Sequence, residues 1–240
     1  MIYLDHNATT PLLPQVKETL KELFGEEYGN PSSPYLTGRR ARDLLEESRH
    51  RLAELLGAKP SELIFTSGGS EGNNMVLRQL LFREDPGHLL VSSVEHPSVL
   101  ETAKWLTRKN NLSLGILPVD QSGKVPESSM EAAVQPETCF ISVMAANNET
   151  GTVQPFRELA LIARERQVPF HSDCVQYAGK CELDLESSGL NYATLTAHKL
   201  GGPKGIGLLY IREGSPFSPL ITGGGQERSL RAGTENVAMA

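Results

Sequence analysis

The sequence has few cysteines, no long apolar run and no excess of positive charge. Its three cysteines, Cys139, Cys174 and Cys181, show neither metal-ligand spacing nor an even-numbered disulfide framework, so we expect no metal site and a cytoplasmic setting. No apolar run approaches membrane-spanning length, and the N-terminus lacks the charged and apolar regions of a secretory signal. A net charge of −6 disfavours direct nucleic-acid binding, which needs a basic surface.

The composition and the pattern of apolar residues are typical of a globular α/β protein. Hydrophobic residues make up 39% of the 240 positions and charged residues 22%, which argues against disorder. Short aliphatic and β-branched runs recur without clean alternation, as expected of strands buried on both faces, and helical patterns separate most of them. The sequence therefore predicts a mostly parallel sheet flanked by helices, with strands at 63–66, 89–92, 112–117, 139–144, 168–173, 192–196 and 207–211.

Two helices are expected before the first strand. Pro14 suits the first turn of a helix that Gly25 stops, and a longer helix with leucines at helical spacing stops at Gly57. A further helix is expected at 156–166. No internal repeat or linker interrupts the pattern.

Polar clusters follow five of the expected strands. In parallel α/β sheets, ligands bind beyond the carboxyl ends of the strands. Stability alone does not explain reactive or hydrogen-bonding side chains at so many strand ends, so we expect a binding site there. The clusters are 67–74, 95–96, 147–151, Asp173 and 198–199.

Lys199 is the most informative of these residues. It follows an apolar run and His198, and a glycine-rich turn at 201–205 comes next. Most lysines beside glycine turns are solvated surface residues. At the edge of such a sheet, however, a lysine can form a Schiff base with pyridoxal 5′-phosphate (PLP), a cofactor that acts as an electron sink.

The other clusters offer groups that suit such a cofactor. The turn at 67–74 joins a strand to a helix start, where free N–H groups and the Ser70 hydroxyl favour an anion; an ordinary turn with Ser70 as N-cap is an equal alternative. Asp173, at the end of a buried strand, needs a cationic partner, which a protonated pyridine nitrogen would supply; the alternative is a structural salt bridge or a helix cap. Gln176 could donate to a ring oxygen, although a lone amide is more often at the surface.

Histidines complete the candidate set. His96, before Pro97, could stack on an aromatic cofactor and carry protons near neutral pH, whereas a lone loop histidine is usually polar surface. His198 and Thr196 flank Lys199 and could reach a phosphate.

With these residues in this order, the chain resembles PLP enzymes of the aspartate-aminotransferase fold, and most closely the cysteine desulfurases of the NifS/IscS type. The resemblance covers essentially the whole chain. Its motifs include Asn7-Ala8-Thr9-Thr10, Phe65-Thr66-Ser67-Gly68-Gly69, Val94-Glu95-His96-Pro97, Ala146-Asn147-Asn148-Glu149-Thr150-Gly151, Ala197-His198-Lys199, and the stretches 29–33, 202–207, 223–228 and 231–236.

The resemblance implies a role for each residue. Lys199 holds the cofactor and moves the proton of the substrate α-carbon, and His96 stacks on the ring as acid and base. Asp173 pairs with the pyridinium nitrogen. Gln176 and Asn148 contact the phenolate oxygen and the bound amino acid. The phosphate is bound by Ser70, Thr196 and His198, and Thr234 is expected to reach the phosphate of the neighbouring subunit, which implies a homodimer.

The family's nucleophilic cysteine, and the arginine that binds the substrate carboxylate, lie downstream of residue 240. Cys139 and Cys174 fall in or beside buried strands and are interpreted as small hydrophobic residues. Cys181 lies in an expected loop and matches no motif. We therefore assign no catalytic cysteine. The expected organisation is an N-terminal arm at 1–15 that belongs with the small domain, a PLP-binding large domain at 16–240 in three layers around the sheet, and no C-terminal small domain.

The implied activity is conversion of L-cysteine to L-alanine, with sulfur held as a persulfide and passed on for iron–sulfur cluster assembly or tRNA thiolation. An iron–sulfur scaffold protein is an implied partner. A selenocysteine lyase or another class-V aminotransferase-like enzyme is one alternative. A catalytically inactive partner or scaffold of a desulfurase is another, and a purely structural α/β domain is a third.

Overall fold

The computed structural model describes residues 2–240 and is built around one seven-stranded sheet. The strand order is β1-β7-β6-β5-β4-β2-β3, and β7 runs antiparallel to both of its neighbours while all other pairs are parallel. The predicted mostly parallel α/β sheet is confirmed. The strands are β1 (Leu63–Thr66), β2 (Gly87–Ser92), β3 (Leu112–Leu117), β4 (Thr138–Ser142), β5 (Phe170–Asp173), β6 (Tyr192–Thr196) and β7 (Gly207–Ile211).

Four strands have the predicted bounds, and three differ by one or two residues, β2 and β5 at their start and β4 at both ends. The predictions at 139–144 and 168–173 included Val143, Met144 and Val168, which lie outside β4 and β5. All three side chains are buried. An apolar run therefore marks burial, and burial extends beyond the hydrogen-bonded ladder.

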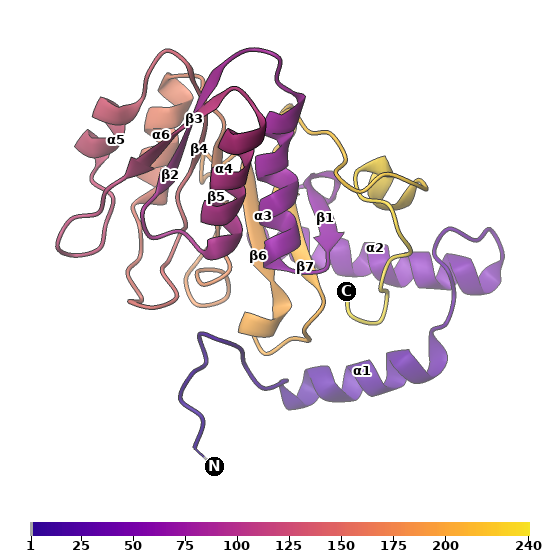
Figure 1. Cartoon of the computed structure of the whole chain (residues 1–240). Helices are drawn as coiled ribbons and strands as arrows, with labels where there is room; N and C mark the ends of the chain where they lie inside the picture. The colour runs from indigo at the N-terminus through magenta and orange to yellow at the C-terminus, as the bar shows by residue number, and fades with distance from the viewer. Residues whose placement is uncertain (1) are drawn as a thin grey trace.

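Helices cover both faces of the sheet and produce the predicted three layers (Figure 1). Alternate residues of β1 enter different cores, because strand side chains alternate between faces: Ile64 packs with one cluster, and Leu63 and Phe65 with the other. The Ile64 face carries α3 (Gly69–Leu77) and α4 (Pro97–Lys109). The opposite face carries α2 (Leu36–Leu56), α5 (Glu127–Ala133) and α6 (Phe156–Glu165).

The predicted start of the first helix at Pro14 and the predicted stop of the second at Gly57 are confirmed, but Gly25 does not stop the first helix, which continues to Glu26. Helix α1 (Pro14–Glu26) begins at Pro14, and α2 ends before Gly57, whose left-handed conformation (φ 59°) caps it. None of the residues of α1 is buried. Short 3₁₀ helices complete the chain: η1 (Pro60–Glu62), η2 (Arg78–Phe82), η3 (Ala197–Lys199) and η4 (Gln226–Ser229).

The segment before α1 runs along the carboxyl-end edge of the sheet. Thr10 N–H donates to the His198 carbonyl, and Leu13 N–H donates to the Gly201 carbonyl, both at 2.9 Å. These contacts come from the N-terminal arm expected at 1–15. Over residues 2–240, no helix has the length and apolar character needed to cross a bilayer.

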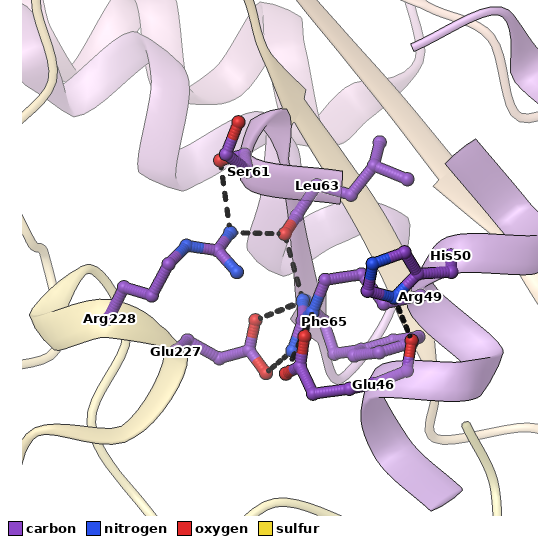
Figure 2. A network of polar contacts seen from close by, with 8 residues as sticks. All are labelled: Glu46, Arg49, His50, Ser61, Leu63, Phe65, Glu227 and Arg228. Atoms are coloured by element: carbon purple, nitrogen blue, oxygen red, sulfur yellow. Dashed lines mark hydrogen bonds and ion pairs between the residues drawn. The ribbon is translucent and has the colours of Figure 1, made fainter. Parts of the chain in front are cut away.

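A buried ion pair fastens η4 to the start of the sheet (Figure 2). The Arg49 guanidinium, 1% exposed, donates two parallel hydrogen bonds of 2.8 Å to Glu227, and Glu227 also accepts from Phe65 N–H at 2.9 Å. Arg228 donates to the Leu63 carbonyl. Glu227, Arg228 and Ser229 all have positive φ (44°, 56° and 65°). Such strained backbone persists only when surrounding contacts fix it, and this network supplies those contacts.

The Arg49–Glu227 pair gives a stability prediction. Glu227→Gln removes the buried one of the two carboxylates paired with Arg49 and leaves only the half-exposed Glu46 at its Nε, so the free energy of unfolding should fall by about 3–5 kcal/mol in urea denaturation. Glu213→Gln, which breaks the exposed Lys59–Glu213 pair, is the matched control and should change little. Equal effects of the two substitutions would contradict this assignment.

Candidate functional site

The carboxyl ends of the strands surround a cleft of about 480 Å³. Except for Thr234, every residue that the sequence singled out lines it: Ser70, His96, Asn148, Asp173, Gln176, Thr196, His198 and Lys199. Thr234 is exposed on the segment after η4, outside this cleft. The parallel strands thus bring residues more than a hundred positions apart to one edge.

Asp173 closes β5 at the floor of the cleft and is 4% exposed. Its Oδ2 accepts from Asn73 Nδ2 at 2.7 Å, and its Oδ1 accepts from Val175 N–H at 3.0 Å. Burial raises the pKa of this carboxyl, and the Asn73 hydrogen bond opposes that rise. No basic side chain of residues 2–240 forms an ion pair with it. The alternative of a structural salt bridge is therefore wrong: the carboxylate faces the cleft without an ion-pair partner, and the charge of Lys199 acts on it from beyond ion-pair distance.

Lys199 lies in η3, and the N-terminal arm covers it. Its Nζ donates to the carbonyl of Ala8 at 2.7 Å and contacts the carbonyl of Asn7. Burial lowers the pKa of Lys199, and the charge of Lys180 lowers it further. A lysine with a lowered pKa is more often the neutral amine that attacks a carbonyl carbon.

The arm also forms a hydrogen bond with the Gln176 side chain. Gln176 Nε2 donates to the Asn7 carbonyl at 2.8 Å, and Gln176 Oε1 accepts from Lys180 at 2.7 Å. The Asn7 side chain donates to the Asn148 carbonyl at 3.2 Å. Sequence reasoning quoted Asn7 within a motif but assigned it no contact, and it missed Lys180.

The turn after β1 has the features of an anion site. Helix α3 begins at Gly69, and its N-cap is Gly68 at φ 149°, so the alternative that made Ser70 the N-cap is wrong. The N–H groups of the first turn of a helix have no intrahelical acceptor and point outward. They border a hollow lined by Ser70, Thr196, His198 and Lys204.

One acidic residue stands at the same helix end. The Glu71 carboxylate accepts from Arg231 at 2.8 and 3.2 Å and from Ser67 N–H at 2.8 Å. Its pKa lies below the usual value, because these hydrogen bonds and the Arg231 charge outweigh burial. Arg231 therefore neutralises the carboxylate, which leaves the helix end suited to an anion.

His96 stands on the rim of the cleft as the N-cap of α4. Its Nδ1 accepts from Ser98 N–H at 3.1 Å and lies 2.7 Å from Ser98 Oγ. Pro97 occupies the first helical position, where a proline is well tolerated. Ser98 was not predicted; its only signal was its place two residues after the histidine.

The cysteines lie away from the cleft. Cys174 is fully buried, and burial raises the pKa of its thiol to about 12. Cys139 is half-buried with a raised pKa, and Cys181 is exposed beside a separate apolar hollow. Within residues 2–240, no cysteine lines the cleft, and no cluster of three or more potential ligands is arranged to hold a metal.

Glu95 is a further group that sequence reasoning left without a role. Its Oε1 accepts from Ser92 Oγ and from Met144 N–H, both at 2.7 Å, and its Oε2 has no hydrogen-bond partner among residues 2–240. Burial raises the pKa of Glu95 to about 8, and the nearby charge of Asp173 adds to the rise. The carboxyl is therefore mostly protonated at neutral pH.

Comparison with known proteins identifies the family. The aminotransferase class-V model matches residues 2–240. The chain belongs to this family. It is 45% identical over 239 residues to a cysteine desulfurase IscS of Dictyoglomus turgidum and 41% identical over 238 residues to that of Methanosarcina thermophila, covering 99% and 98% of this chain. It spans 60% and 59% of those relatives' lengths.

Solved structures agree with this class-V aminotransferase assignment. A NifS-like protein superposes with a TM-score of 0.96 at 40% identity, over 99% of this chain and 66% of that one. SspA in complex with cysteine superposes with a TM-score of 0.96 at 37% identity, over 100% of this chain and 70% of that one. The fold and the resemblance to cysteine desulfurases are confirmed.

Glu95 gives a pH prediction. The unfolded carboxyl ionises near its usual 4.5 and the folded one near 8, so the unfolded state of this protein binds fewer protons between these values. The wild type should therefore lose stability relative to Glu95→Gln as pH rises from about 4.5 to about 8, by up to about 1.4 kcal/mol per pH unit, and level off above. Chemical denaturation of both proteins across this range measures the difference. A flat difference would show that Glu95 is ionised when folded.

Proposed function

We propose that the chain is the cofactor-binding part of a PLP-dependent cysteine desulfurase. The observation that carries the proposal is one cleft that holds a lysine with a lowered pKa and a buried carboxylate without an ion-pair partner. These are the two groups that a pyridoxal cofactor needs at its aldehyde and at its ring nitrogen. The 45% and 41% identical relatives, both named cysteine desulfurase, support the reaction.

The residues present fit the cofactor. Lys199 would hold it covalently, Asp173 would pair with its ring nitrogen, and Gln176 and Asn148 would contact its ring oxygen and the amino-acid substrate. Ser70, Thr196, His198 and the first turn of α3 would bind its phosphate. When bound, the cofactor supplies an electron sink for the carbanion formed at the substrate α-carbon.

Proton movements would then fall to two side chains. Lys199 Nζ, once released from the cofactor, is the base that takes the α-proton, and His96 is the second proton carrier at the rim. The Asn7 and Ala8 carbonyls that now contact Lys199 Nζ must release it, so the N-terminal arm moves or re-pairs on cofactor binding.

The rest of the proposal concerns the whole protein. We propose that L-cysteine is the substrate, that residues 16–240 form the large domain and that the 1–15 arm belongs with a small domain. We further propose a cytoplasmic homodimer in which Thr234, exposed beyond the cleft, reaches the phosphate of the partner's site, and a sulfur-acceptor protein such as an iron–sulfur scaffold.

Cofactor binding tests the central proposal. The purified chain incubated with PLP should develop a visible absorbance band distinct from that of the free cofactor. Borohydride reduction followed by peptide mass spectrometry should find the cofactor on Lys199, and Lys199→Ala should abolish both signals. Lys204→Ala, which removes the nearby lysine, should keep the adduct. A folded chain that gives no adduct would refute the cofactor assignment.

Sulfur chemistry gives a second prediction. Because no cysteine of residues 2–240 lines the cleft, the chain with PLP and L-cysteine should release little sulfide. Replacing Cys139, Cys174 and Cys181 by alanine or serine, one at a time, should leave the amount of Lys199 adduct unchanged. Robust sulfide release that one of these substitutions abolished would contradict the prediction.

A further inference from the structure

A continuous hydrogen-bonded chain links Asp173 at the floor of the cleft to His96 on its rim. Asn73, on α3, contacts Asp173 and Ser98, and Ser98, in the first turn of α4, contacts His96. Four separate positions of the sequence, from two helices, a strand end and a cap, meet in this chain. Neither Asn73 nor Ser98 has a role in the function proposed above.

The Asn73 amide determines which groups donate and which accept at the Asp173 end of this series of hydrogen bonds. Its Nδ2 lies 2.7 Å from Asp173 Oδ2 and 2.9 Å from Ser98 Oγ, so both amide hydrogens are used. The opposite amide orientation would set its carbonyl oxygen against a carboxylate oxygen, two acceptors that repel each other. Asn73 is 1% exposed, and its Oδ1 has no hydrogen-bond partner among residues 2–240, so the two acceptors that face Nδ2 set the amide orientation.

Because Ser98 accepts a hydrogen bond from Asn73, it can donate one to His96. Its Oγ accepts from Asn73, so its own hydrogen is free to donate to His96 Nδ1, 2.7 Å away. The Ser98 backbone N–H also points to His96 Nδ1 at 3.1 Å, and a backbone N–H can only donate. Two donors on Nδ1 leave no place for a proton on that nitrogen.

We infer that Asn73 and Ser98 are positioning residues that hold neutral His96 as the tautomer with its proton on Nε2. The Asp173 carboxylate accepts from the Asn73 amide, the amide also donates to the Ser98 hydroxyl, and the hydroxyl donates to His96. The His96 ring is therefore an acceptor at Nδ1 and a donor at Nε2. The consequence for catalysis rests on the proposed function: neutral His96 would meet the substrate as a proton donor through Nε2. The tautomer itself does not depend on it.

Nuclear magnetic resonance of the ¹⁵N-labelled full chain, without added cofactor, tests the tautomer. At about pH 8, above the usual histidine titration range, long-range ¹H–¹⁵N spectra should show His96 with a protonated Nε2 and a bare Nδ1; the signal is assigned by its loss in His96→Asn. His50 is an internal reference of the opposite tautomer, because its Nδ1 lies 2.7 Å from the Glu46 carbonyl, which only accepts. A proton on Nδ1 of His96 would overturn the inference.

Variants separate positioning from general structure. Ser98→Ala should lower the ratio of the two His96 tautomers about tenfold, equivalent to about 1.4 kcal/mol, and Ser98→Thr should restore it. Asn73→Ala should shift the ratio in the same direction, while Asn74→Ala on the same helix should not. A Ser98→Ala spectrum identical to the wild type would refute the inference even if Asn73→Ala fails to fold. If the wild-type chain forms no PLP adduct on Lys199 but His96 still carries its proton on Nε2, the proposed function is refuted and the tautomer inference stands.

Discussion

The burial of the Asp173 carboxylate at the end of β5 is the constraint on which the site depends. A carboxylate out of water needs hydrogen bonds and positive charge. The fold supplies two hydrogen-bond donors but, within residues 2–240, no ion pair, and the Lys199 charge acts only from a greater distance. The cleft above it holds the lysine, histidine and amide side chains of the neighbouring strand ends. A cationic ring placed there satisfies the carboxylate and brings these groups into contact with one ligand.

The sheet makes this arrangement possible because its central strands are parallel. Strands β4, β5 and β6 end at the same edge, so Asn148, Asp173 and Lys199 meet although they are distant in sequence. Two cores, one on each face, hold the strands in register. The Arg49–Glu227 pair connects this frame to the strained turn at η4 (Figure 2). Beyond that turn, Arg231 donates to Glu71 at the start of α3.

The sequence predicted the strands and the loops of the site well, because both depend on local signals. Apolar runs marked the strands, and polar residues directly after them marked the cleft. The arm over Lys199 was not predictable in this way: its contacts use the Asn7 and Ala8 carbonyls, which every residue carries. Asn73 and Ser98 were missed for a related reason. A polar residue in a helix start has many uses, and only the folded distances show that these two contact Asp173 and His96.

Two buried carboxyl groups near one another pose an electrostatic problem that the fold solves by giving them unlike surroundings. Asp173 accepts an N–H at each of its oxygens, whereas Glu95 accepts two donors at one oxygen and none at the other. The oxygen of Glu95 that has no donor can carry a proton, and the pKa of Glu95 is about 8. While Glu95 remains neutral, no second negative charge opposes the ionisation of Asp173. The ionised form of Asp173 is the one that orients Asn73 and that would pair with a cationic ring. The proton on Glu95 thus helps to keep the charge at the floor of the cleft.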